Sequence, residues 1–129
     1  MRLRFFNSQQ NQPRNAFVYE TDFLQSPTPN YILDLEVQWT NADYDETNEW
    51  LSIYGGTMGP EALQVDVWND TDWVTVLTDL EIGWNSVNVS SYLTSSTFKI
   101  RFRDTLQTDD LTQDSWEIDA TFLHVWTAE

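Results

Sequence analysis

The chain has 129 residues, of which 40% are hydrophobic and 15% aromatic, and 21 acidic residues against 6 basic ones give a formal net charge of −15. This length suits one domain with a single core, and the aromatic content argues against a disordered chain. The charge argues against nucleic acids and anionic membranes as partners, because phosphate binding needs clustered Lys and Arg. The absence of cysteine excludes disulfides and Cys-ligated zinc.

Residues 1–16 differ in charge from everything that follows. Arg2, Arg4 and Arg14 give this segment +3, whereas the remainder of the chain carries −18. We therefore expect an extended basic arm at residues 1–16 and a single β-sandwich domain at residues 17–129. The arm is either a frayed terminus or a segment that lies on the acidic body of a neighbouring subunit.

From Phe17 onward the hydrophobic residues recur with a period of two, which is typical of strands. Turn residues such as the Gly55-Gly56 pair and the 69–72 segment separate the strands. We expect strands at residues 17–24, 33–40, 50–54, 63–68, 73–78, 84–89, 98–103 and 116–126. About eight short strands, each with one apolar side, predict an all-β, antiparallel β-sandwich.

Two loops are rich in acidic residues. The loop at residues 104–115 contains four aspartates and is expected to be solvated, with cation binding as the alternative. The segment from Asn41 to Glu46 has the alternating acids of an EF-hand start. An EF-hand is not expected there, because Glu46 stands where the turn needs Gly and Ser52 where the last Glu is needed.

Large aromatic residues divide into two groups by their alternation. Four tryptophans are expected in or near the core: Trp39, Trp73, Trp84 and Trp116. Four aromatic residues are harder to place inside: Tyr44, Trp50, Trp68 and Trp126. We predict Trp68, Tyr44 and Trp50 as ligand-binding residues. Exposed aromatic residues serve either as a subunit interface, which we favour, or as a platform for sugar rings.

No catalytic constellation is visible. His124 is the one histidine and lies in an expected strand, and no motif with a Ser or Cys nucleophile accompanies it. We therefore do not expect an enzyme.

The region from residue 84 to residue 126 resembles the closing part of the galactose-binding-like jelly rolls, which include MAM-type domains and many carbohydrate-binding modules. The resemblance lies in SYL at 91–93, TFKIRFR at 97–103 and WEID at 116–119, with a looser match in FVYETDF at 17–23. The resemblance implies a jelly-roll sandwich with a structural calcium ion between Glu20 and Asp119. Ala120 departs from the family pattern, which usually has a second Asp there. The pattern is also similar to modules in archaeal surface and virion proteins.

These observations lead to two expectations for function. The first is a non-catalytic structural or surface protein, a subunit of a virion or extracellular assembly that contacts copies of itself or other subunits. The alternative is a calcium-stabilised carbohydrate-binding module with a glycan as partner. Neither a signal peptide nor a transmembrane span is visible in the sequence. The expected location is the virion or the cell surface.

Overall fold

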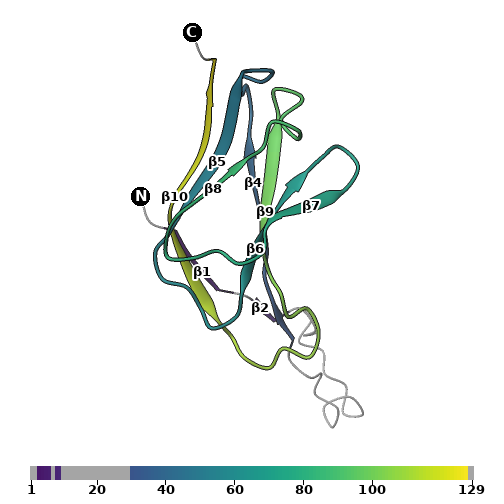
Figure 1. Cartoon of the computed structure of the whole chain (residues 1–129). Helices are drawn as coiled ribbons and strands as arrows, with labels where there is room; N and C mark the ends of the chain where they lie inside the picture. The colour runs from purple at the N-terminus through teal and green to yellow at the C-terminus, as the bar shows by residue number, and fades with distance from the viewer. Residues whose placement is uncertain (1–2, 7, 10–29, 128–129) are drawn as a thin grey trace.

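A computed structural model describes residues 3–6, 8–9 and 30–127 of the chain. All ten regular elements in these ranges are strands (Figure 1). The expected strand at residues 17–24 lies outside the described residues. Within the predicted arm, two short stretches are described, and both pair with strands of the same chain.

Eight of the strands form two antiparallel four-stranded sheets, which confirms the all-β prediction. The order in sheet 1 is β1 (Leu3–Phe6), β10 (Ser115–Trp126), β5 (Asn48–Gly55) and β8 (Gly83–Asn88). The order in sheet 2 is β4 (Asp34–Trp39), β9 (Phe98–Asp104), β6 (Leu63–Trp68) and β7 (Trp73–Leu77). The short strands β2 (Ser8–Gln9) and β3 (Tyr31–Ile32) pair with each other.

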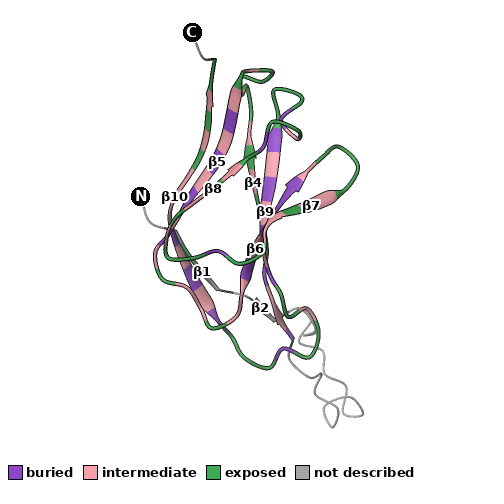
Figure 2. Ribbon diagram, in the orientation of Figure 1, coloured by how far each residue is buried: buried purple, intermediate pink, exposed green. Residues whose placement is uncertain are grey.

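The hydrophobic core lies between the two sheets. Alternate residues of each strand point into it, for example Leu51 and Ile53 of β5 and Val65 and Val67 of β6. Trp116 is the largest completely buried side chain. Figure 2 shows this alternation along β5 and β9, whereas most of the connecting loops are exposed. Burying these apolar surfaces is the main contribution to stability.

The outer side of sheet 2 carries charge. Every basic residue after residue 16 lies on β9, namely Lys99, Arg101 and Arg103. The Nζ of Lys99 lies 5.1 Å from the ring centroid of Trp68, and the Cζ of Arg101 lies 4.7 Å from that of Trp73. These cation–π contacts cover the sheet surface with aromatic rings and alkyl stems.

Asp66, an acidic residue, is buried beneath this cover. Arg101 Nε donates a hydrogen bond to its Oδ2 at 2.6 Å. Thr75 Oγ1 and Gln64 Nε2 donate to its Oδ1 at 2.7 and 3.0 Å. The ion pair is thus complemented by neutral donors, which a buried carboxylate requires.

We predict that Asp66→Ala lowers the free energy of unfolding by about 3 kcal/mol, because it leaves the Arg101 charge without its buried partner. The matched control is Asp34→Ala, whose carboxylate lies 3.9 Å from the same guanidinium but whose side chain is 53% exposed. That substitution is expected to cost less than about 1 kcal/mol. Urea unfolding measures both, and equal costs would contradict the prediction.

Candidate functional site

A β-bulge divides strand β10 into two halves with opposite orientations. The register against β5 shifts between Ile118 and Ala120. Before the shift, Trp116 and Ile118 point into the core. After it, Leu123 and Val125 pack against the core instead. One inserted residue moves a whole strand segment to the other side of the sheet. The even-numbered residues after the bulge therefore face outward.

This reversal brings the end of β10 into a part of the outer surface of sheet 1 that has no Asp, Glu, Lys or Arg. Across the three strands, Phe122 of β10 lies opposite Ser52 of β5, and Ser52 lies opposite Ser86 of β8. In the same way, His124 of β10 lies opposite Trp50 of β5, and Tyr54 of β5 lies opposite Trp84 of β8. We call the surface the aromatic face and define it as Asn48, Trp50, Ser52, Tyr54, Trp84, Ser86, Asn88, Ala120, Phe122, His124 and Trp126. None of these residues is Asp, Glu, Lys or Arg, in a chain with a net charge of −15.

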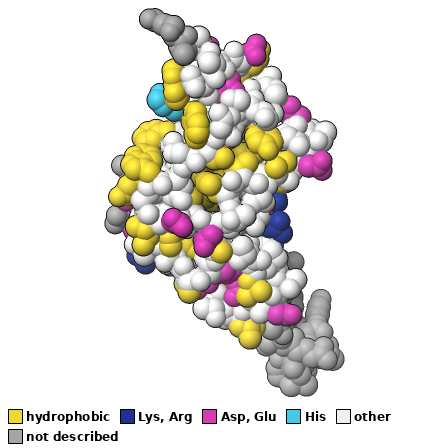
Figure 3. All heavy atoms as spheres, viewed as in Figure 1, with side chains coloured by type: hydrophobic (Ala, Val, Ile, Leu, Met, Phe, Trp, Pro, Cys, Tyr) yellow, Lys and Arg dark blue, Asp and Glu magenta, His cyan; other side chains and the backbone are white. Residues whose placement is uncertain are grey.

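The aromatic face contains a hollow of about 410 Å³. Ser52 and Ser86 line it, and their hydroxyl oxygens lie 2.9 Å apart. Trp84 and Phe122 are 60% and 54% exposed, and their ring centroids are 6.0 Å apart at an interplanar angle of 29°. His124 lines the hollow too, with its ring centroid 4.3 Å from that of Trp126. Figure 3 shows hydrophobic side chains beside the histidine on the β10 side of the molecule.

The three predicted ligand-binding residues are not brought together. Trp50 belongs to the aromatic face, as its pairing with His124 shows. Trp68 of β6 is half-buried on the outer side of sheet 2. Its ring centroid lies 5.3 Å from that of Trp73. Tyr44 lines a separate recess of about 370 Å³ beside the loop between β4 and β5.

The expected position in or near the core is correct for Trp116 and for Trp39, which packs half-buried against the core. It is wrong for Trp84 and for Trp73, whose ring lies beside Arg101 on the outer side of sheet 2. Trp116 is completely buried, and its indole Nε1 donates to the carbonyl oxygen of Glu61 at 3.2 Å. Trp84 points outward because it lies opposite Tyr54 on the outer side of sheet 1, whereas Val87, an odd number of residues away, packs toward the core.

The predicted calcium pair is described only in part. Glu20 lies outside the described residues. Asp119 sits at the bulge, where its two carboxylate oxygens lie 3.1 and 3.2 Å from the point a Cβ on Gly56 would occupy. The turn is fixed to β10 there, because Gly56 N donates to the Glu117 carbonyl at 2.8 Å. A side chain at position 56 would press against the carboxylate.

The expectation that the acidic segment at residues 104–115 is solvated is wrong for three of its four aspartates, although most of the residues around them are exposed. Asp104 and Asp110 are 0% and 2% exposed, and Asp114 is 9% exposed. Asn30 holds the loop in place: its Nδ2 donates to the Gln107 carbonyl at 2.9 Å, and its Oδ1 accepts from the Asp110 amide at 3.0 Å. Satisfying the loop's backbone groups in this way keeps it against the body of the protein.

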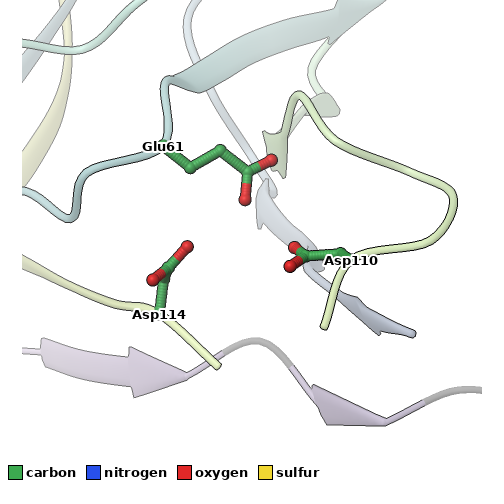
Figure 4. A group of neighbouring side chains, drawn as sticks. All are labelled: Glu61, Asp110 and Asp114. Carbon is green, nitrogen blue, oxygen red and sulfur yellow. The ribbon is translucent and has the colours of Figure 1, made fainter. Parts of the chain in front are cut away.

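A cluster of three carboxylates results. Glu61, in the turn before β6, and Asp110 and Asp114, in the loop before β10, each place an oxygen within 4.8 Å of the others. Figure 4 shows the three carboxylates directed toward one another. We call this group the acidic cluster. An oxygen-only set of this kind suits a hard divalent cation.

Burial and mutual repulsion make this cluster costly to ionise. Burial raises the pKa of Glu61 to about 7, with further increases from Asp104 and Asp110, and the backbone amide of Leu106 opposes the rise. The pKa of Asp114 is raised as well, first by burial and then by Asp110 and Asp104. Both effects disfavour the charged carboxylates.

Sequence reasoning missed Glu61 as a site residue. It is a lone acid between Pro60 and Ala62, and nothing in its surroundings marks it. Its proximity to the β9–β10 loop follows from the pairing of β6 with β9, in which Leu63 lies opposite Asp104.

Comparisons with protein-family models, with curated proteins and with solved structures find no match. In the described part of the chain, no helix is long and apolar enough to cross a membrane. The aromatic face and the acidic cluster are therefore the two features from which a function can be argued.

With a chelator present, we predict that the wild-type protein loses stability relative to Glu61→Gln as the pH rises from 5 to 8. The pKa of Glu61 is 4.5 in the unfolded chain and about 7 in the folded protein. The protonated carboxyl therefore contributes to the folding stability fully below pH 4.5, and this contribution is lost as the pH rises through 7. Glutamine stays neutral throughout. Melting curves across this pH range test the prediction, with the exposed Glu36→Gln as control. A constant difference between wild type and Glu61→Gln would contradict it.

Proposed function

We propose that this protein is a non-catalytic jelly-roll module that binds a neutral saccharide on its aromatic face. The observation that carries the proposal is the hollow in this face, where two serine hydroxyls lie among exposed aromatic rings.

The order of the strands supports the jelly roll. Without the short β2 and β3, and counted along the chain, the strands lie in the order 1-8-3-6 in one sheet and 2-7-4-5 in the other. A double Greek key that folds two antiparallel sheets together produces this alternation. The same topology is expected from the resemblance of residues 84–126 to the galactose-binding-like sandwiches.

The chemistry of the aromatic face suits a sugar ring. A pyranose has apolar faces of C–H groups and a rim of hydroxyls, so it needs aromatic surfaces beside small polar groups. Trp84 and Phe122 offer exposed rings, while Ser52 and Ser86 offer hydroxyls that both donate and accept. The net charge of −15 disfavours an acidic sugar, and the aromatic face contains no Lys or Arg to attract one.

We predict that Trp84→Ala weakens retention on a neutral polysaccharide at least about tenfold, since it removes an exposed aromatic ring at the hollow. Affinity electrophoresis through gels with hydroxyethyl cellulose or galactomannan measures the change. Folding should be preserved, because the side chain is 60% exposed.

The matched control is Trp68→Ala on the outer side of sheet 2. This substitution should leave retention unchanged, because Trp68 lies on the opposite sheet from the hollow. If Trp68→Ala abolishes retention and Trp84→Ala does not, the binding surface is on sheet 2 and the proposal is wrong. Absence of retention on every neutral polysaccharide would also count against it.

Assembly into a virion or extracellular structure is the second candidate function. It is supported by β10, whose outer edge from Ala120 to Trp126 pairs with no strand among the described residues. An exposed strand edge offers hydrogen-bonding groups to another chain. The +3 charge of residues 1–16 against the −18 of the rest gives subunits a further reason to associate.

Replacing Arg2, Arg4 and Arg14 together by Gln tests this candidate without removing the β1 backbone. The variant should form smaller particles than the wild type in size-exclusion chromatography with light scattering, because the charge contrast is lost. High salt should have the same effect on the wild type. Identical masses for variant and wild type would remove the support that charge gives to assembly.

A further inference from the structure

We propose that the acidic cluster of Glu61, Asp110 and Asp114 binds a divalent cation, calcium in preference to magnesium. The ion would join the turn before β6 to the loop before β10. This site shares no residue with the predicted Glu20–Asp119 pair, and it does not depend on saccharide binding.

The observation beyond the cluster itself is an unsatisfied atom. Asp110 is 2% exposed, and its Oδ1 accepts a hydrogen bond from the Thr112 amide at 3.0 Å. Its Oδ2 is completely buried and has no hydrogen-bond partner among the described residues. A buried carboxylate oxygen without a partner is costly, and native structures seldom leave one. Asp110 directs its carboxylate toward Glu61 and Asp114, so a ligand at this point would complete it (Figure 4).

The spacing of the oxygens fits one ion. Calcium binds oxygen at 2.3–2.6 Å, so two ligands of the same ion lie at most about 5 Å apart. The three carboxylate oxygens lie within 4.8 Å of one another. Three carboxylates supply the negative charge that a divalent cation needs, and the group contains no His or Cys for a softer metal.

The backbone holds the carboxylates together despite their repulsion. The Asp110 carbonyl accepts from the Tyr31 amide at 3.0 Å, and the Asp110 amide donates to Asn30 Oδ1 at 3.0 Å. On the other side, the buried Trp116 holds the Glu61 carbonyl at 3.2 Å. These contacts fix both segments, so the ion would enter a preformed site. An irregular loop accommodates calcium's variable coordination better than the strict octahedron of magnesium.

Isothermal titration of the chelator-treated protein with calcium chloride at pH 8 tests the proposal. We expect one calcium ion per chain at this site and weaker binding of magnesium. At a calcium concentration about 100 times the dissociation constant, the melting temperature should rise by roughly 5–10 °C.

Asp110→Asn should weaken calcium binding at least about tenfold, because it removes one charged ligand. Without calcium, its melting temperature should equal or exceed that of the wild type, because repulsion in the cluster is reduced. If Asp110 had only a structural role, the substitution would lower the melting temperature without calcium. Should Asp110→Asn fail to fold, Asp114→Asn serves as the second variant, with the same weakening expected.

The matched control is Asp109→Asn, next to Asp110 in the same loop. Asp109 is exposed and has a φ of 57°, which asparagine adopts as readily as aspartate. The Asp109→Asn variant should bind calcium with the same affinity as the wild type. Asp119→Asn should also leave this site intact. The proposal is overturned if the wild type binds no calcium, if magnesium binds more tightly, or if Asp119→Asn abolishes binding while Asp110→Asn and Asp114→Asn do not.

Discussion

The bulge in β10 is the constraint on which the outer surface of sheet 1 depends. Up to Ile118 the even-numbered residues of the strand fill the core, and from Ala120 onward they face outward. Without the register shift, Phe122 and Trp126 would point between the sheets. The bulge thus converts a uniformly alternating segment into one that fills the core at its start and displays aromatic rings at its end. Gly56 allows this, because it leaves room for the Asp119 carboxylate.

Strand β10 also connects the two candidate sites. It begins one residue after Asp114 of the acidic cluster and ends at Trp126 of the aromatic face. Trp116, near its start, is completely buried and holds the turn that carries Glu61. A cation in the cluster would therefore fix the entry to the strand that displays Phe122. This would be a structural role for the ion, since none of its ligands belongs to the aromatic face.

Alternation in the sequence predicted the seven longer strands from β4 onward, because each has one side in the core. It did not predict β1, which lies within the expected arm and joins sheet 1. The prediction failed where a single inserted residue changes the register of β10. The even-numbered residues from 116 to 126 form one uninterrupted series without charged or hydroxyl side chains of Asp, Glu, Lys, Arg, Ser or Thr, so nothing in the sequence marks the bulge. The outward position of Trp84 depends on the register of β8 against β5, which alternation does not reveal. The burial of Asp110 depends on the distant Asn30, and the proximity of Glu61 depends on the pairing of β6 with β9. Such contacts between remote segments are a property of the fold.

We propose that the bulge in β10 exposes a surface for saccharide binding. The seven tryptophans provide the most direct test, since each indole N–H gives its own signal in a nitrogen-15 correlation spectrum. On titration with a neutral oligosaccharide such as cellohexaose or a galactomannan fragment, we expect shifts of the signals of Trp84 and Trp50 and none for Trp68 or Trp73. Shifts at Trp68 and Trp73, with Trp84 unchanged, would contradict it.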